Sequence, residues 1–522
     1  MCLACLFAGM AADARAKVTP AALFSDHMVL QQGKPLCVWG TAAPGERVEV
    51  SLGTRASASA TAGVTGEWMI GLPPQPVIAE PQTLRIRGEN EIRIEDVLVG
   101  EVWIGSGQSN MSITTRESSD WESVRKEIAG GEYSRVRMFQ VGWIAADSPL
   151  RDIAGARWRV AEESSVRNFS AIMVYFARAL QRARPGVPIG IIQSAVGATN
   201  AHAWLPGDAF ENGKGAAHVR RWYREQLEKL PGENKIHAEK LAEHGRAVAK
   251  AKQEKTPPPR APEPPMGPQS KRRPTCLYNG MIAPLQPYAI RGVAWYQGEN
   301  NSSLQWAGDY AALMEDLIND WRGEWARAAR SDRPEAFPFL IVQLPNYKTG
   351  NVWPLLREQQ ERVAKNVPHT ALVCAIDAGD AEDIHPCNKA PVGERLALAA
   401  RALAYGETGI VWSGPVLRDV SYDAGKAIVS FGNTGGGLVT ADGGAPRGFE
   451  LAGADGKFSP ASAKITEGKI VLESGDVPGP VAVRYAWANN PENLNLYNKE
   501  KLPAFPFRTD GWKWPGSTTW AR

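Results

Sequence analysis

The pattern of apolar and polar positions changes twice along this chain of 522 residues. Between residues 18 and 98, short runs such as 44–52 and 82–87 alternate apolar and polar residues, with glycine, proline and asparagine between them. A period of two is typical of strands that bury one face. We therefore expect an N-terminal β-sandwich domain over residues 17–98.

From about residue 99, longer apolar runs alternate with helical patterns. Strands are expected at 102–104, 187–193, 291–297, 337–344 and 370–377, and helices at 170–180, 306–326, 354–365 and 391–405. This alternation predicts a parallel sheet covered by helices on both faces, over residues 99–408. Functional side chains are expected where the strands end.

Residues 207–275 interrupt that order. A charged helical pattern covers 225–255, and a proline-rich run follows at 257–265. We expect an exposed helical excursion with a stiff return linker. Strand patterns return after residue 409, so a C-terminal β-domain with a tail is expected over 409–522.

The first ten residues are apolar, and small residues follow them. Ala14-Arg-Ala16 fits the small-x-small rule of signal cleavage, so residues 1–16 are interpreted as a signal peptide, although basic residues are missing before the apolar run. The protein is then secreted or periplasmic. No later run approaches the roughly 20 apolar residues of a membrane span, so no membrane anchor is expected.

Composition narrows the range of partners. The net charge of +3 gives no reason to expect nucleic acid. The 18 tryptophans exceed the 13 phenylalanines, and flat indole rings suit stacking on sugars, although most tryptophans are expected in the core. Signal cleavage leaves four cysteines, too few for a disulfide scaffold. Of these, Cys374 and Cys387 either form a bridge or stay as two free buried thiols.

Ser109 is the candidate nucleophile. An apolar strand at 102–104 runs into a turn relaxed by Gly105 and Gly107, which would place the Ser109 hydroxyl at a strand's carboxyl end. Nucleophilic serines are exposed in this way, with the next backbone N–H groups aimed at a developing oxyanion.

Histidine is scarce enough for elimination, because the chain has only seven. Of these, His202 and His385 follow apolar strands at the expected edge of the sheet. Asp383 precedes His385 by two residues and could hold its imidazole tautomer, while a purely structural histidine is the alternative. Cys374, His385 and Cys387 fit no common zinc spacing, so we expect neither a metal nor another cofactor.

Four segments in order carry a family resemblance: 105–111, 278–285, 295–301 and 383–389. Together they resemble the sialate O-acetylesterase family of SGNH-type carbohydrate esterases, and the similarity runs from Met28 to Asp510. The resemblance implies a flavodoxin-like α/β hydrolase domain flanked by N- and C-terminal β-sandwich domains. It also implies Ser109 as nucleophile, His385 as general base and Asp383 as the acid of the triad.

The resemblance further implies an oxyanion hole. The Ser109 N–H, the turn at Gly197 and Ala198, and the segment 297–301 would form it. Glu299 would either position the substrate or only hydrogen-bond the turn at Gln297. Candidate oxyanion-hole or substrate-binding residues are therefore Gln108, Gly197, Gln297, Glu299 and Asn301.

Two departures from the family pattern leave alternatives open. The wider SGNH spacing would make Glu382 the acid, whereas the family's own Asp-x-His spacing favours Asp383. The usual Trp-Gly-Gly-Thr block reads Val-Gly-Ala-Thr at 196–199. The donor at Ala198 survives if its φ is negative, and His202 just beyond is expected to change the walls of the acyl or sugar pocket.

These observations predict a secreted serine esterase that removes O-acetyl groups from a carbohydrate and resembles sialate O-acetylesterase. One alternative is an acetylesterase that acts on plant hemicellulose such as xylan. An alternative of another class is a carbohydrate-binding protein with an inactive hydrolase domain.

Overall fold

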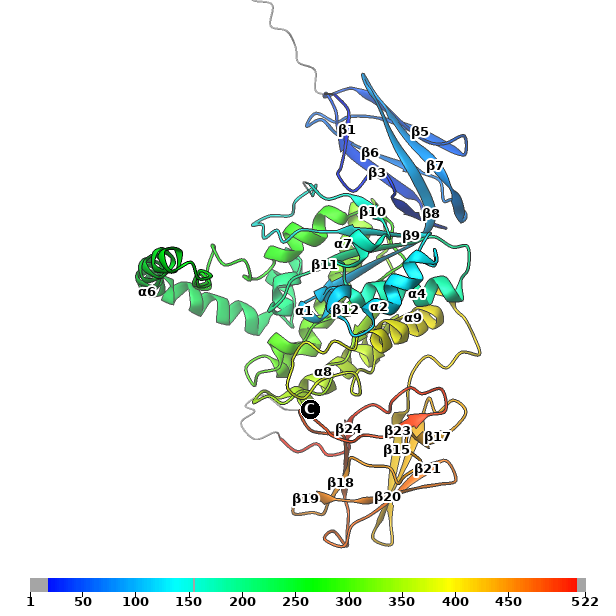
Figure 1. Cartoon of the computed structure of the whole chain (residues 1–522), viewed down its shortest axis with the longest axis vertical. Helices are drawn as coiled ribbons and strands as arrows, with labels where there is room; N and C mark the ends of the chain where they lie inside the picture. Colours follow the sequence, from blue (N-terminus) through cyan, green and yellow to red (C-terminus); the bar gives the residue numbers. More distant parts are fainter. Residues whose placement is uncertain (1–16, 154, 514–522) are drawn as a thin grey trace, which may run out of the picture.

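The computed structural model describes residues 17–153 and 155–513 of the chain (Figure 1). The expected signal peptide at 1–16 lies outside these residues. A β-rich region, a central α/β region and a second β-rich region follow one another along the long axis (Figure 1). None of the helices in the described part of the chain is both long and apolar enough to cross a membrane.

The N-terminal strands form two sheets. One sheet has the order β1 (Thr19–Pro20), β3 (Leu36–Thr41), β6 (Glu67–Leu72). In the other, β4 (Arg47–Leu52) pairs with β5 (Ala56–Thr61) and β7 (Ile78–Arg87), and β8 (Glu91–Gly107) pairs with β7 and with β2 (Val29–Gln31). Because β8 continues into the central region, it crosses the boundary expected at residues 98–99.

The part of the sheet that β8 forms in the central region positions the candidate site. Its order is β10 (Trp158–Val160), β9 (Val136–Gln140), β11 (Ile189–Ala195), β8, β12 (Gly292–Tyr296), β13 (Phe339–Val342), β14 (Thr370–Val373). Neighbours from β9 to β14 are parallel, as the buried apolar runs predict. The sheet is nevertheless mixed, because β10 pairs with β9 in the antiparallel direction.

Two helix pairs accompany this sheet: α4 (Ala171–Ala183) with α9 (Ala390–Tyr405), and α7 (Tyr310–Ala328) with α8 (Trp353–Asn366). Gly393 allows the close contact between α9 and α4, since a Cβ there would lie 2.6 Å from Cβ of Tyr175. Short helices complete the region: α1 (Ser109–Ser112), α2 (Trp121–Ala129), α3 (Glu163–Val166) and α5 (Gly207–Asn212).

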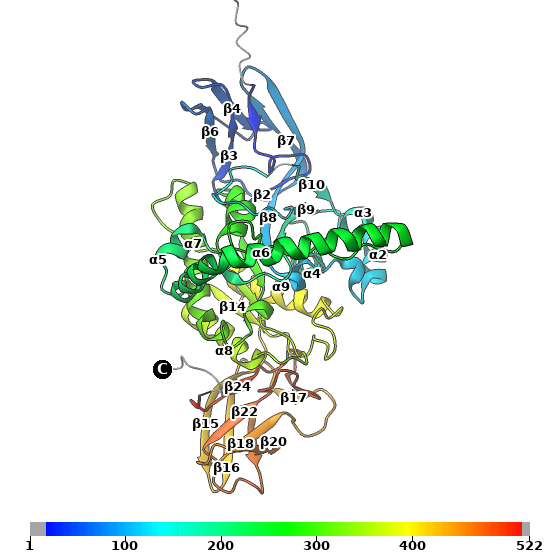
Figure 2. The ribbon, with the colours of Figure 1, turned by 90° about the vertical axis from the view of Figure 1, so that its left-hand side faces the viewer.

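The excursion is a long helical arm. Helix α6 (Ala217–Glu254) has 38 residues, contains Pro231, and buries only Val219 and Ala251. It leaves the body on the side where α1 lies, and its far half crosses in front of that side (Figures 1 and 2). The following segment, residues 255–273, returns to the body.

The C-terminal strands have their own core. One four-stranded sheet has the order β15 (Val416–Asp423), β16 (Lys426–Gly432), β21 (Lys469–Glu473), β20 (Ser462–Thr466). Another has the order β19 (Phe458–Pro460), β18 (Phe449–Ala452), β22 (Ala482–Tyr485), β24 (Phe507–Arg508), and β17 (Leu438–Thr440) pairs with β23 (Leu496–Asn498). Buried Arg357 of α8 ties this region to the central one by donating to the carbonyls of Leu344 and Ala488.

Candidate active site

Ser109 is the first residue of α1, directly after β8. The turn before it requires glycine, because Gly107 has φ +127° and a Cβ there would lie 2.1 Å from the carbonyl oxygen of Tyr296 on β12. The close approach of two parallel strands therefore forces a tight turn, and this turn presents the Ser109 hydroxyl at the carboxyl end of the sheet.

His385 lies in the loop between β14 and α9, and its Nε2 is 2.9 Å from Oγ of Ser109. This distance is within the hydrogen-bond reach that a general base needs to take the serine proton. The structure thus brings together the two residues that the sequence singled out.

The carboxylates around His385 are arranged less simply. Asp383 accepts a 2.8 Å hydrogen bond from the backbone N–H of His385, and no bond from its carboxylate to the imidazole occurs among the described residues. Glu382 is exposed and pairs with Lys348 at 2.6 Å.

Glu117, which sequence reasoning missed, accepts hydrogen bonds from the hydroxyl and amide of Thr114. These bonds lower the pKa of its carboxyl, and the nearby His385 lowers it further.

Gly197 lies against the nucleophile, since a Cβ on Gly197 would be 3.4 Å from Cβ of Ser109. The next residue does not have the negative φ on which survival of the donor at Ala198 was made conditional, because Ala198 has φ +54°. A side chain in this left-handed region is strained, which explains why glycine suits the position better than alanine.

The side chains of Gln108 and Gln297 connect the segments of the site through contacts in its interior. The amide nitrogen of Gln297 donates to the carbonyl of Thr199 at 3.0 Å and to Oδ1 of Asn301 at 2.8 Å, while Oε1 of Gln108 lies 3.3 Å from it. Both glutamines are buried, and their contacts are structural. Asn301 differs, because its buried Nδ2 has no hydrogen-bond partner among the described residues and stays available as a donor.

A buried polar chain lies beneath the two reactive residues. Lys389 Nζ donates to Oδ1 of Asn110 at 2.5 Å, and Nδ2 of Asn110 donates to Glu299 at 2.5 Å and to the carbonyl of Ile384 at 3.0 Å. Burial raises the pKa of the Glu299 carboxyl and lowers the pKa of Lys389 to about 8. Since Asn110 follows Ser109 and Ile384 precedes His385, this chain fixes one residue relative to the other.

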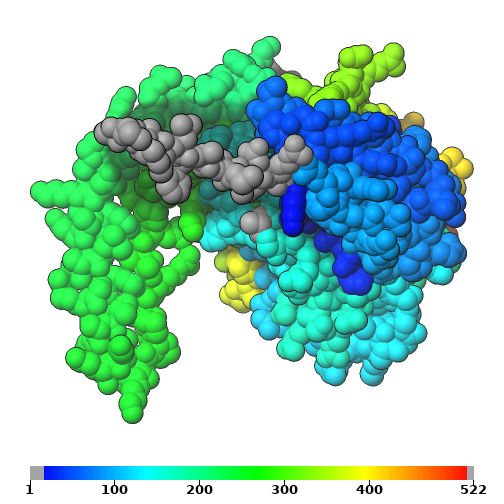
Figure 3. Space-filling view, turned by 90° about the horizontal axis from the view of Figure 1, so that it is seen from above, coloured from blue at the N-terminus to red at the C-terminus, as the bar shows by residue number. Residues whose placement is uncertain are grey.

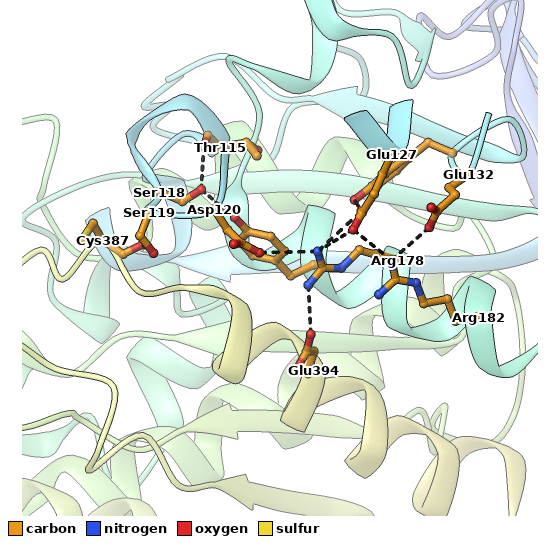
Figure 4. Close-up of polar contacts among 12 residues, drawn as sticks. Thr115, Ser118, Ser119, Asp120, Glu127, Glu132, Arg178, Arg182, Cys387 and Glu394 are labelled. Atoms are coloured by element: carbon orange, nitrogen blue, oxygen red, sulfur yellow. Dashed lines mark hydrogen bonds and ion pairs between the residues drawn. The ribbon is translucent and has the colours of Figure 1, made fainter. Parts of the chain in front are cut away.

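A second network holds the loop beyond His385 (Figure 4). The backbone N–H of Ser119 donates to the carbonyl of Cys387 at 3.1 Å, and the hydroxyls of Ser118 and Tyr175 are 2.6 Å apart. Buried Arg178 of α4 then anchors the segment through ion pairs, which join it to Asp120, Glu127 and Glu394. The loop is therefore tied to α4 and α9 through residues distant in sequence.

The reactive pair opens into a cavity of about 420 Å³. Besides Ser109 and His385, its lining includes Trp143, Arg260 and Arg272, which sequence reasoning missed. Both arginines belong to the return segment of the excursion. Arg260 lies within the proline-rich run and Arg272 beyond it. Neither position signals a place in an active site, so only the arrangement in space reveals the two arginines.

His202 does not shape this cavity, contrary to our expectation. It is fully buried between the rings of Trp222 and Trp306, with centroid distances of 5.3 and 5.5 Å. Burial lowers the pKa of His202 to about 3, so it is a neutral core residue at the root of the arm.

The four cysteines that the structure describes, Cys37, Cys276, Cys374 and Cys387, are not bridged. Cys374 is buried, whereas Cys387 is exposed, so neither the bridge nor a pair of buried thiols is present. Among residues 17–153 and 155–513, no group of three or more His, Cys, Asp or Glu side chains is arranged to hold a metal ion.

The sequence matches a known family, described as "Carbohydrate esterase, sialic acid-specific acetylesterase", over residues 99–235 and 269–402. The chain belongs to this family. It is 29% identical to the mouse sialate O-acetylesterase and 28% identical to the human one, over 93% of this chain and 93% and 91% of theirs. These relatives confirm the family resemblance carried by the four motifs.

Among solved structures, this carbohydrate esterase is similar to a carbohydrate acetylesterase from Xanthomonas citri. The two are 35% identical with a TM-score of 0.78, over 95% of this chain and all of the other. The family match leaves out residues 236–268, which comprise the far half of α6 and part of the return segment. Arg260 of the cavity therefore lies in the part of this esterase that the family match omits.

Proposed function

We propose that this carbohydrate acetylesterase is a secreted or periplasmic serine esterase of the SGNH type, with a hydrolase domain at 99–408 between two β-domains. It removes O-acetyl groups from a carbohydrate. The observation that carries the proposal is the 2.9 Å distance between Oγ of Ser109 and Nε2 of His385, in a cavity large enough for a sugar ester.

In this proposal Ser109 attacks the acetyl carbonyl while His385 takes the hydroxyl proton. The tetrahedral oxyanion accepts hydrogen bonds from the backbone N–H groups of Ser109 and Gly197 and from the unpartnered Nδ2 of Asn301. His385 returns the proton to the sugar oxygen, which leaves as an alcohol. Water, activated by the same histidine, then hydrolyses the acetyl-enzyme and releases acetate.

Asp383 is proposed as the acid of the mechanism. Its carboxylate accepts a hydrogen bond from the backbone N–H of His385 at 2.8 Å, which supports a role in positioning this histidine and in stabilising the imidazolium that forms. Gln108, Gln297 and Glu299 act as supports rather than as groups that touch the substrate.

Sialate esters are the first candidate substrates, because the relatives are sialate O-acetylesterases. Acetylated hemicellulose such as xylan is the second, since the Xanthomonas citri structure is described only as a carbohydrate acetylesterase. A carbohydrate-binding protein with an inactive hydrolase domain is disfavoured by the intact contact between Ser109 and His385.

Acetate release from acetylated sialic acid, acetylated xylan and acetylated mannan, measured side by side, tests the proposal. We expect release from at least one of the three, and no release by the Ser109→Ala variant with the same substrate. Binding of these sugars by the wild-type protein without any acetate release would establish the inactive alternative instead.

A further inference from the structure

We infer that Trp143 is the platform on which the acetylated sugar ring lies, and therefore a specificity-determining residue of this esterase. The inference rests on the proposed function and adds the sugar-binding wall of the same site. Trp143 combines two properties: its large apolar side chain is exposed, and it lies next to the reactive pair.

Trp143 is 50% exposed and lines the cavity that contains Ser109 and His385. Most large aromatic rings of the central region are fully buried, among them Trp103, Trp158, Trp204, Trp295, Trp321 and Trp353. Exposing an indole ring to water costs free energy, so its position at a cavity mouth indicates a surface that a ligand covers. A sugar ring supplies a matching flat C–H face, and the indole N–H, which has no partner among the described residues, can donate to a hydroxyl.

The backbone around Trp143 is held in place before any substrate arrives. Its loop is fastened to the segment after the excursion, because the N–H of Ala146 donates to the carbonyl of Cys276 at 3.0 Å and Nδ2 of Asn279 donates to the carbonyl of Asp147 at 3.1 Å. Arg273 adds an ion pair with Asp147 at 2.5 Å. A platform fixed in this way loses little conformational entropy when a ligand binds.

The return segment supplies the other side of this binding wall. The ammonium of Lys271 lies 5.5 Å from the centre of the Trp143 ring, a cation–π contact. Glu263 pairs with both Arg260 and Arg272 and so joins the two cavity arginines. Beyond them the arm stands clear of the body, with open space between the two (Figure 3).

The test compares a sugar ester with an ester too small to use the platform. For Trp143→Ala we expect kcat/KM on the best acetylated carbohydrate to fall roughly tenfold to thirtyfold, chiefly through KM, as for other contact tryptophans. The loss on ethyl acetate should be clearly smaller than the loss on the carbohydrate, because ethyl acetate has no sugar ring to lie on the indole. Trp143→Phe keeps a flat ring and should retain most of the carbohydrate activity.

Trp512→Ala is the matched control, because Trp512 is also exposed but lies in the C-terminal region, against Phe458. It should change neither reaction. If wild type deacetylates the sugar and Trp143→Ala does so with an unchanged kcat/KM, the platform is refuted and the proposed function stands. If wild type hydrolyses ethyl acetate but no acetylated carbohydrate, the proposed function is wrong and the platform is refuted with it.

Discussion

Oγ of Ser109 and Nε2 of His385 lie 2.9 Å apart although 276 positions separate the two residues in the chain. Such a contact between a turn serine and a loop histidine has one direct consequence. Removal of either partner should stop the first chemical step without removing any core contact.

Ser109→Ala should lower kcat on an aryl acetate by several orders of magnitude, roughly 10⁴-fold or more, as nucleophile knockouts in other serine hydrolases do. Thermal unfolding should be unchanged, because the lost hydroxyl lies at the mouth of the cavity. Steady-state kinetics and a melting curve check both statements. Turnover within about tenfold of wild type would place the nucleophile elsewhere.

Replacing each of the three carboxylates near His385 by its isosteric amide, and comparing the loss of kcat, shows which carboxylate contributes most to catalysis. Asp383→Asn should lower kcat by roughly 10- to 100-fold, less than the 10⁴-fold effect of an acid bonded directly to the imidazole, because Asp383 holds the backbone N–H of His385. Glu382→Gln should have little effect, since Glu382 is exposed and paired with Lys348.

Glu117→Gln completes the comparison, because this carboxylate lies near enough to His385 to interact with its charge. We expect an effect smaller than that of Asp383→Asn. A larger loss at Glu382 or Glu117 than at Asp383 would show that the acid of the mechanism is one of those residues.

Lys389→Met should weaken the buried polar chain that positions Ser109. The change leaves Oδ1 of Asn110 and the buried Glu299 without their cation, which should cost about 3 kcal/mol of unfolding free energy. We also expect kcat to fall about tenfold with little change in KM, since Asn110 adjoins Ser109 and bonds the residue before His385. Urea unfolding and kinetics measure the two effects.

Lys365→Met is the matched control, because Lys365 is exposed and forms an ion pair with Glu361 one helical turn away. It should cost less than about 1 kcal/mol and leave kcat unchanged. Equal effects of the two lysine variants would contradict a specific role for the buried chain.

Ala198→Gly should stabilise the protein. Ala198 has φ +54°, and release from this strained conformation should add up to about 1 kcal/mol of unfolding free energy, after the greater flexibility of glycine in the unfolded chain is subtracted. Activity should persist, because the backbone N–H groups keep their places. A lower midpoint in urea would show that the alanine methyl makes a contact worth more than the strain.

His202 should make stability depend on pH. Its pKa is lowered to about 3 in the folded protein, against about 6.5 in an unfolded chain, so the unfolded state binds the extra proton between these values. The free energy of unfolding should therefore fall by about 1.4 kcal/mol for each pH unit as pH drops from 6.5. In His202→Phe this part of the slope should vanish, and an unchanged slope between pH 7 and pH 5 would show that His202 is not the group responsible.

The sequence by itself predicted the central parallel strands and proposed the two residues of the reactive pair. Period-two runs and long apolar runs predict which segments become half-buried and fully buried strands, because burial selects the side chains directly. The turn around Gly107 and the motif at 383–385 indicated Ser109 and His385, since local glycine geometry and residue chemistry are written in neighbouring positions. These predictions needed no knowledge of which segments meet.

Only the tertiary structure decided which side chains meet across the sheet. A position after an apolar strand does not distinguish His202, sealed between two tryptophans, from His385, exposed beside Ser109, because both histidines have it. Likewise the proline-rich return segment brings Arg260 to the cavity, and a short loop brings Trp143 there. Burial and the placement of long loops depend on contacts summed over the whole chain, and single-sequence periodicity carries no record of those contacts.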